Sequence, residues 1–251
     1  MPSDRRNGQT PRLAILTAIP EEIAAFGAHL VETGRDLVAG VPIRLGTLDG
    51  RPVALAESGI GKVNAALAAT ILFDRFDCDG IVFSGVAGGL DPALSVGELV
   101  IASDVIQHDY GAVVNGELEV YRAGTLPFPE FRGDVRFEAD LRLISGAHNA
   151  LAESPSVHFG TILTGDSYLG CGVTREKLFD RFAAKAIDME SGAVAQVANA
   201  FGAPWLIIRA LSDLAGEDSR LDFQAFAAEA ARKAAAAVLK SMPLFEWETG
   251  T

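Results

Sequence analysis

The acids of the segment AIDMESGAVA, residues 186–195, stand where an apolar stretch gives way to small helix-forming residues. Asp188 and Glu190 flank Met189 in this segment. In an extended chain the two carboxylates share one face, whereas a helix that begins at Glu190 turns them apart. Such carboxylates are candidates for proton transfer, because burial or a neighbouring acid raises a carboxyl pKa toward neutrality. The sequence alone leaves both geometries open.

A second set of polar residues closes the apolar run of IIRALSDLAG, residues 207–216. Arg209, Ser212 and Asp213 follow one another there, and burying such side chains without partners would be costly. Arg209 and Asp213 could form a structural ion pair. Alternatively both could be catalytic, with Ser212 as a substrate-binding residue. Glycines and carboxylates at the ends of other predicted strands favour the functional interpretation.

The first apolar stretch, RLAILTA, leads into Pro20, Glu21 and Glu22. Proline suits the first turn of a helix, and carboxylates there complement the helix dipole. This structural role accounts for Glu21. Glu22 precedes an apolar residue and is also a candidate to point into a cleft.

The glycine-rich segment SGIGK, residues 58–62, resembles a phosphate-binding loop only superficially. Ala56 and Val63 stand where a Walker A loop requires Gly and Ser or Thr, so ATP binding is not expected. The glycines are better explained by a tight turn from a strand into a helix.

A second glycine-rich segment, FSGVAGGL, spans residues 83–90. Asp91 and a proline follow it instead of a helix, which disfavours a dinucleotide site. A glycine turn at the end of a strand would still expose backbone N–H groups to a ligand. Val86, Ala87 and Gly88 are therefore candidate substrate-binding residues.

Length, charge and composition limit the class of protein. The chain has 251 residues, 49% of them hydrophobic, and a formal net charge of −12. The acidity disfavours nucleic acid as a partner, and no apolar run approaches the roughly 18–20 residues of a membrane span.

The four histidines and two cysteines match no metal spacing, so no metal site is expected. Reduced thiols in the cytoplasm are the simplest expectation for Cys78 and Cys171.

Strand and helix patterns alternate along the chain. Around Asp49 and Gly50 apolar and polar residues alternate as in a β-hairpin over 41–58. Helical spacing over 61–76 puts one apolar set on a common side, namely Val63, Leu67, Ile71 and Leu72. Further strands are predicted at 12–18, 80–85, 97–103, 157–163, 185–189 and 204–211. Further helices are predicted from about residue 20, near 137–152, near 174–183, at 190–202 and at 222–241, with an irregular region over roughly 104–135.

This alternation predicts a three-layer α/β domain with a largely parallel sheet and a ligand site at the carboxyl ends of the strands. No linker or repeat divides residues 12–245, which are expected to form a single domain. A short disordered arm over 1–11 and a tail over 246–251 are expected at the ends.

Six stretches, in this order, resemble the purine nucleoside phosphorylase superfamily, and within it the bacterial 5'-methylthioadenosine/S-adenosylhomocysteine nucleosidases. They are AIPEEIAAF, SGIGKVNAALAAT, SGVAGGLDPALSVGELVIASDVIQHD, GTILTGDSYL, AIDMESGAVAQVANAFGAPWLIIRALSD and FQAFAAEAARKAA. They cover most of the chain from Arg12 to the last helix. The resemblance implies a nucleoside phosphorylase-like α/β/α sandwich with a central mixed sheet. It also implies an N-ribosyl hydrolase that needs no cofactor, acts on a small-molecule nucleoside and forms a homodimer.

The resemblance also implies roles for individual residues. Glu22 matches the general base that activates water, Arg209 lies near that water, and Asp213 matches the residue that protonates or hydrogen-bonds adenine N7. Glu190 matches the residue that holds the ribose hydroxyls, with Met189 packed under the sugar. Three further positions match residues of the nucleoside pocket: Tyr168 stacks on adenine, the Leu169 backbone reads the purine edge, and Ile60 lines the alkylthio pocket.

The chemistry of these roles follows from the residue types. Cleaving an N-glycosidic bond builds positive charge on the ribose and negative charge on the departing base. A protonated acid, a carboxylate beneath the sugar and a separate base for water therefore have different tasks. Because Glu22 would repel a phosphate dianion, its presence favours a hydrolase over a phosphorylase.

The chain departs from the family pattern at three places. Val86 stands where serine is usual, and Asp188 stands where glutamate is usual. The segment from His108 onward departs most, so the preferred 5'-substituent is the least transferable property.

Three alternatives accompany the nucleosidase hypothesis. They are a nucleosidase for futalosine-type substrates, a nucleoside phosphorylase, and a non-catalytic nucleoside-binding module. The joint presence of Glu22, Glu190 and Asp213 argues against the last, because binding alone needs no base to activate water.

Overall fold

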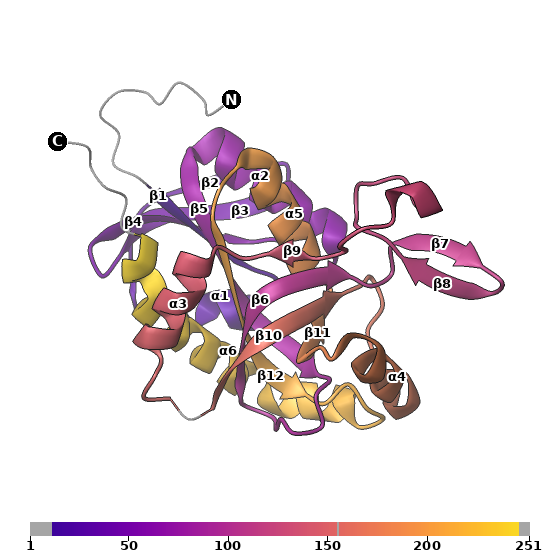
Figure 1. Cartoon of the computed structure of the whole chain (residues 1–251). Helices are drawn as coiled ribbons and strands as arrows, with labels where there is room; N and C mark the ends of the chain where they lie inside the picture. Colours follow the sequence, from indigo (N-terminus) through magenta and orange to yellow (C-terminus); the bar gives the residue numbers. More distant parts are fainter. Residues whose placement is uncertain (1–11, 155, 246–251) are drawn as a thin grey trace.

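The computed structural model describes residues 12–154 and 156–245 (Figure 1). The predicted arm over 1–11 and tail over 246–251 lie outside the described residues. The strands are β1 (Arg12–Thr17), β2 (Leu30–Val38), β3 (Val41–Leu48), β4 (Arg51–Glu57), β5 (Cys78–Gly89), β6 (Leu99–Gln107), β7 (Gly111–Val114), β8 (Glu117–Val120), β9 (Phe137–Glu138), β10 (Val157–Thr164), β11 (Ala186–Asp188) and β12 (Trp205–Asp213). The helices are α1 (Pro20–Ala24), α2 (Lys62–Phe76), α3 (Leu141–Ala150), α4 (Gly172–Phe182), α5 (Ser191–Phe201) and α6 (Ser219–Ser241), with 3-10 turns at Pro129–Phe131 and Met242–Phe245.

The central sheet is mixed and partly closed on itself. Its strands follow the order β11-β10-β6-β12-β5-β1-β4-β3-β2. β1 pairs in parallel with both β4 and β5, whereas β12 is parallel to β5 and antiparallel to β6. β11 pairs with β10 on one side and with β5 on the other, which closes a circuit of five strands. This circuit brings the ends of β5, β11 and β12 together although they are far apart in the sequence.

Helices cover both faces of the sheet, which gives the predicted three layers. Along β1, Leu16 packs into a core shared with α2 and α5, whereas Ile15 packs into a second core shared with α3 and α6. Successive side chains of a strand point to opposite faces, so β1 supplies both cores. Figure 1 shows α2 and α5 together on one side of the sheet and α1, α3 and α6 on the other. None of the helices in the described ranges is long and apolar enough to cross a membrane.

Helix α2 buries only part of the apolar side that the sequence indicated. Ile71 and Leu72 are buried, but Val63 is 80% exposed and Leu67 is 41% exposed. Alanines make most of the contact instead, since the buried side of the helix begins with Ala65 and Ala68. Helix α2 lies against α5, and small side chains let the two helices approach closely. Sequence periodicity weighted the larger side chains and therefore selected part of the exposed face.

The glycine-rich residues 86–89 continue the strand predicted at 80–85 and do not form the predicted turn. β5 continues to Gly89 because it has a partner on each side over its last residues. Ala87 pairs with Leu211 of β12, and Gly88 pairs with Ile187 of β11. Tertiary pairing thus extends a strand that the local sequence ends at residue 85.

Other elements differ from the prediction at the edges of the fold. The hairpin at Asp49 and Gly50 is confirmed, with both residues at positive φ, but β2 adds a third antiparallel strand that was not predicted. The region 104–135 contains the end of β6 and the projecting hairpin of β7 and β8, so it is not irregular throughout. The predicted helix at 137–152 begins only at Leu141, where Asp140 caps it by accepting from the Arg142 N–H.

Truncating the buried side of α2 should destabilise the protein. Leu72→Ala is expected to lower the free energy of unfolding by about 2–5 kcal/mol, because it leaves a cavity between α2 and the sheet. Leu141→Ala is the matched control, since that leucine is 80% exposed; a change within about 0.5 kcal/mol is expected there. Urea unfolding followed by circular dichroism measures both. Equal losses in the two variants would contradict this packing of α2.

Candidate functional site

Glu22 is buried at the carboxyl end of β1 and is held by three backbone N–H groups. Its Oε2 accepts from Ala18 at 2.6 Å and from Ile19 at 3.1 Å, so it caps its own helix α1. Its Oε1 accepts from the Val86 N–H on β5 at 2.8 Å. Burial raises the pKa of Glu22, although the charge of Arg209 and the three N–H groups oppose the rise. Glu21 is exposed, as its purely structural interpretation requires.

Arg209 lies inside β12 with a completely buried guanidinium group. Its Nε and Nη2 are each 2.8 Å from Asp188 Oδ2, and Nη2 is 3.5 Å from Glu190 Oε2. The guanidinium also stacks over the Phe83 ring at 3.8 Å. Arg209 therefore pairs with Asp188 and Glu190, and the interpretation as an Arg209–Asp213 ion pair is wrong. Nη1 is buried and has no hydrogen-bond partner among the described residues.

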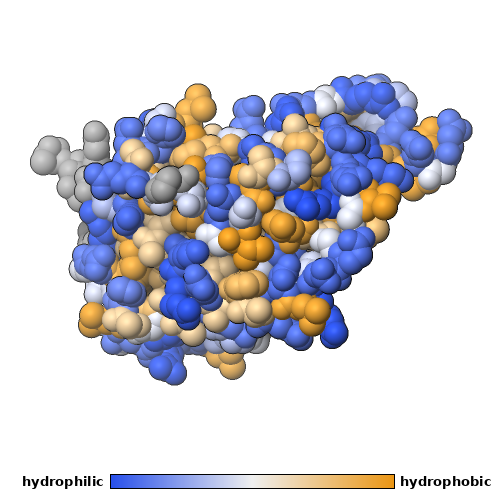
Figure 2. Space-filling view, turned by 90° about the horizontal axis from the view of Figure 1, so that it is seen from below, coloured by the Kyte–Doolittle hydropathy of each residue, from blue (hydrophilic) through white to orange (hydrophobic). Residues whose placement is uncertain are grey.

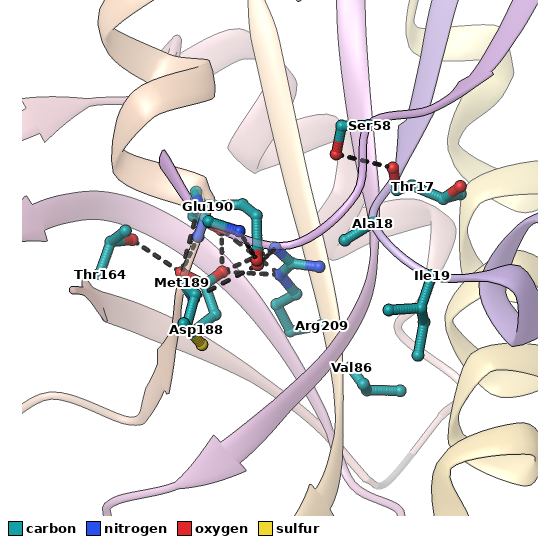
Figure 3. Close-up of polar contacts among 12 residues, drawn as sticks. Thr17, Ala18, Ile19, Ser58, Val86, Thr164, Asp188, Met189, Glu190 and Arg209 are labelled. Carbon is teal, nitrogen blue, oxygen red and sulfur yellow. Dashed lines mark hydrogen bonds and ion pairs between the residues drawn. The ribbon is translucent and has the colours of Figure 1, made fainter. Parts of the chain in front are cut away.

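The side chains that hold Arg209 come from three elements (Figure 3). Asp188, the last residue of β11, accepts from Thr164 Oγ1 at 2.7 Å and from the Ser191 hydroxyl. In Figure 3 Arg209 stands between this group and the β1 end with Ile19. Thr164 and Ser191 carry no conspicuous sequence signal, and their contribution is visible only in the fold.

Gly85 of β5 brings the two halves of this cluster together. A Cβ added at Gly85 would lie 2.2 Å from Arg209 Nη1 and 2.4 Å from Glu22 Oε1. Both atoms therefore lie close to this glycine and to each other, and any side chain at position 85 would displace them. Sequence reasoning noted the glycines of this segment but did not single out Gly85.

The junction of β11 and α5 resolves the two geometries that the sequence left open. β11 ends at Asp188, α5 begins at Ser191, and Glu190 is the residue before the helix with φ −136° and ψ −38°. Glu190 Oε1 accepts from the Gly61 N–H at 2.8 Å. Burial and the charge of Asp188 raise the pKa of Glu190 to about 7, against the opposing charge of Arg209. The half-buried Met189 separates the two acids.

Asp213 is the last residue of β12 and follows a register shift in the pairing of β12 with β5. Leu211 and Asp213 face consecutive residues of β5, so Ser212 is an extra residue in the pairing, as in a β-bulge. Asp213 Oδ2 accepts from Ser212 Oγ at 3.0 Å, and Oδ1 accepts from the Ala215 N–H at 2.8 Å. Burial raises the pKa of Asp213, and these two hydrogen bonds oppose the rise.

Gly88 lies against Asp213 much as Gly85 lies against Glu22. A Cβ at Gly88 would be 3.1 Å from Asp213 Oδ1, while Ser212 Oγ also reaches the Ala87 carbonyl at 3.4 Å. Gly85 and Gly88 are three residues apart on β5, a separation of roughly 10 Å along a strand. Glu22 and Asp213 therefore contact β5 at two separate points along the strand.

The remaining predicted residues lie in loops that lead to this cluster. Ile60 and Tyr168 are 55% and 53% exposed. Ile60 precedes Gly61, which contacts Glu190. The carbonyl of the half-buried Leu169 accepts from Ser219 Oγ of α6 at 3.5 Å. Within the described ranges no group of three or more His, Cys, Asp or Glu side chains is placed to hold a metal ion.

Comparisons with known proteins identify the family. The sequence profile of the phosphorylase superfamily matches residues 12–242. The chain is 42% identical over 247 residues to 5'-methylthioadenosine/S-adenosylhomocysteine nucleosidase of Mycobacterium bovis, covering 92% of this chain and 97% of that protein. The chain belongs to the phosphorylase superfamily and, within it, to the 5'-methylthioadenosine/S-adenosylhomocysteine nucleosidase family.

Solved structures of this family share the fold. The nucleosidase of S. pneumoniae, determined with the transition-state inhibitor MT-ImmA, superposes with a TM-score of 0.84 at 32% identity, over 94% of this chain and 100% of that one. Futalosine hydrolase of Helicobacter pylori superposes with a TM-score of 0.83 at 27% identity, over 93% of this chain and 98% of that one. The mixed sheet and helix layers expected from the resemblance are confirmed.

The raised pKa of Glu190 should make stability depend on pH. Between the ordinary glutamate pKa of 4.5 and about 7, the folded protein holds a proton that the unfolded chain has released. The free energy of unfolding therefore falls as the pH rises through this window. Glu190→Gln removes the ionising group, so its stability relative to the wild type should increase between pH 5 and pH 8, by on the order of 2–3 kcal/mol.

Urea unfolding at pH 5, 7 and 8 measures this difference. Glu229→Gln serves as the control, because that carboxylate is exposed on α6 and lies outside the cluster. A difference between Glu190→Gln and the wild type that stays constant across these pH values would show that Glu190 is an ordinary acid.

Proposed function

We propose that this protein hydrolyses the N-glycosidic bond of 5'-methylthioadenosine, S-adenosylhomocysteine or a related 5'-modified adenosine, with water, to release adenine. The relatives at 42% and 32% identity carry this activity in their names. Three buried acids with different surroundings support the proposal, because each of them matches one of the tasks that the reaction sets.

The observation that carries the proposal is the buried donor of Arg209 beside the buried carboxylate of Glu22. Both groups border Gly85, and Nη1 has no partner among the described residues. A water molecule that accepts from Nη1 and donates to Glu22 would be oriented for attack. Burial raises the pKa of Glu22, which makes its carboxylate a better proton acceptor.

A carboxylate next to this position favours water over phosphate. A phosphate dianion would meet the charges of Glu22 and, nearby, Glu190 and Asp188, while Arg209 is the one buried cation among the described residues. Val86 supplies its backbone N–H to Glu22, and this contact does not depend on the side chain. The valine therefore preserves the positioning of Glu22 while the hydroxyl of the usual serine is lost.

Glu190 and Asp213 take the other two tasks in this proposal. Glu190 accepts hydrogen bonds from the ribose hydroxyls and stabilises the positive charge that develops on the sugar, with Met189 beneath the ring. Asp213 delivers a proton or a hydrogen bond to adenine N7, and its raised pKa keeps a proton available closer to neutrality. Tyr168 stacks on adenine, Leu169 contacts the purine edge through its backbone, and Ile60 lines the alkylthio side.

The assay that tests the function compares candidate substrates directly. 5'-Methylthioadenosine, S-adenosylhomocysteine, 5'-deoxyadenosine, inosine and futalosine are each incubated with the protein, with and without phosphate, and the released base and sugar are identified. Adenine and free 5'-methylthioribose, formed without phosphate, are expected. Phosphate-dependent cleavage would indicate a phosphorylase, and hypoxanthine released from futalosine alone would indicate a futalosine hydrolase.

Removing the acid at N7 should impair turnover more than binding. Asp213→Asn cannot donate a proton, so kcat for 5'-methylthioadenosine is expected to fall on the order of 10²–10⁴-fold with KM changed only a few-fold. Steady-state kinetics measure both constants. Asp180→Asn on the exposed side of α4 is the matched control. Turnover by Asp213→Asn near that of the wild type would rule out the leaving-group role.

We also propose that the protein is a homodimer that uses the exposed face of α2. Val63 and Leu67 are 80% and 41% exposed, and their spacing of four residues puts them on one side of α2. Ile60 precedes the helix and is 55% exposed. Hydrophobic residues are exposed elsewhere as well, as Figure 2 shows for one face of the molecule. We call Ile60, Val63 and Leu67 the α2 stripe. It differs from the other exposed hydrophobic residues because Ile60 also borders the proposed pocket.

A charge on this stripe should dissociate the dimer. Val63→Glu is expected to shift the sedimentation coefficient from that of a dimer to that of a monomer at micromolar concentration. Val31→Glu is the control, because Val31 is 66% exposed on β2 and is not part of the α2 stripe. A Val63→Glu protein that sediments like the wild type would contradict this interface.

The two cysteines are consistent with the proposed cytoplasmic location. Cys78 is buried and Cys171 is exposed, and both are free thiols.

A further inference from the structure

Lys62, Asp109 and Asp166 form a closed group of contacts beside the candidate site. Lys62 Nζ is 2.7 Å from Asp109 Oδ1 and 3.6 Å from Asp166 Oδ2. The Lys62 N–H donates to Asp166 Oδ1 at 2.9 Å, and the Asp166 N–H donates to Asp109 Oδ2 at 2.9 Å. We call these three residues the loop clasp. Neither the sequence motifs nor the proposed chemistry gives any of them a role.

The loop clasp joins three segments that lead into the pocket. Lys62 follows Ile60 and Gly61 at the start of α2. Asp109 follows β6, at the start of the segment that departs most from the family. Asp166 follows β10 and precedes the adenine-side residue Tyr168. The alkylthio, divergent and adenine-side loops are thus held to one another by three side chains.

The start of α2 connects the loop clasp to Glu190. The first N–H groups of a helix have no partner within the helix. Here the Gly61 N–H donates to Glu190 Oε1 at 2.8 Å, and the next N–H, that of Lys62, donates to Asp166. Two successive peptide groups therefore contact the ribose-side carboxylate and the loop clasp. A shift of Lys62 would move the donor of Glu190 with it.

Partial burial strengthens these contacts relative to an ordinary surface pair. The side chains of Lys62 and Asp109 are only 18% and 31% exposed. Burial opposes ionisation of Asp109, but its bonds with Lys62 and the Asp166 N–H hold its pKa below the usual range. Asp109 is therefore charged near neutral pH, and water screens its contact with Lys62 less than it screens a fully exposed pair.

We propose that Lys62 is a positioning residue: through Asp109 and Asp166 it fixes the Gly61 N–H against Glu190 and so orients the carboxylate that holds the ribose hydroxyls. The inference rests on the proposed function for the role of Glu190. It extends that function to a charged group outside the reacting cluster, and it makes recognition of the ribose depend on the loop clasp.

Discrimination between ribose and 2'-deoxyribose substrates tests the proposal. In Lys62→Met the value of kcat/KM for 5'-methylthioadenosine should fall roughly tenfold, the effect of losing one hydrogen bond to a charged group. The value for 5'-methylthio-2'-deoxyadenosine should fall less, because that substrate offers Glu190 only the 3'-hydroxyl. Asp109→Asn should act in the same direction and should have little further effect in the Lys62→Met background.

Lys233→Met is the matched control, because Lys233 is ion-paired with Glu229 on α6 at 3.4 Å, outside the loop clasp. It should leave the ribose preference unchanged. Circular dichroism and thermal unfolding of each variant show whether it is folded. A folded Lys62→Met protein that keeps the wild-type ratio of the two kcat/KM values would overturn the proposal.

A measurement on the ligand-free protein separates this inference from the proposed function. Carbon-13 NMR titration follows the carboxyl group of Glu190, which faces Asp188, Arg209 and Glu22 as well as Gly61. Lys62→Met should raise the pKa of Glu190 further, because a donor to its charged form is displaced. If the wild-type protein cleaves no nucleoside, the function fails, but this titration still decides the positioning role; an unchanged Glu190 pKa would overturn it.

Discussion

The burial of one arginine is the constraint on which the site depends. Moving a guanidinium group out of water costs several kcal/mol, and only close carboxylates and well-formed hydrogen bonds offset that cost. Asp188 contacts Nε and Nη2 of Arg209, and Thr164 and Ser191 hold Asp188 in turn. This arrangement uses the edge of the guanidinium formed by Nε and Nη2 and leaves Nη1 beside Glu22 and Gly85. Because the buried guanidinium of Arg209 needs these contacts, it has a fixed orientation.

Fixing Arg209 gives the neighbouring acids different properties. Asp188 shares its Oδ2 with the guanidinium, whereas Glu190 lies 3.5 Å from it; burial and the charge of Asp188 raise the pKa of Glu190 to about 7. Glu22 accepts from backbone N–H groups and feels the charge of Arg209, whereas Asp213 has no arginine among its hydrogen-bond partners. The same functional group is therefore suited to separate steps of one reaction, because the burial, the hydrogen bonds and the distance from Arg209 differ from acid to acid.

The closed circuit of strands explains how these groups meet. β5 contacts β1, β11 and β12, and each of these three strands delivers an acid at its carboxyl end. Gly85 and Gly88 let the acids approach the backbone of β5, where any larger residue would collide with them. The bulge at Ser212 then directs Asp213 to its own position along the strand. Outside the circuit, the loop clasp joins the surrounding loops to the start of α2, where the neighbouring Gly61 N–H donates to Glu190.

The sequence by itself determined the alternation of strands and helices, the family and the acids at the strand ends, because apolar runs and their polar boundaries are local properties. It could not determine which acid pairs with Arg209. Asp188 is 21 residues away, and Arg209 contacts Asp188 rather than Asp213 because β11 pairs with β5. It also missed β2, the length of β5 and the buried face of α2, which depend on partners distant in the chain. The contact of Glu190 with Gly61 spans 129 residues. Local sequence thus determined which functional groups are present at the strand ends. Packing decided their partners, orientations and pKa values, because electrostatic and steric interactions depend on distances in space rather than along the chain.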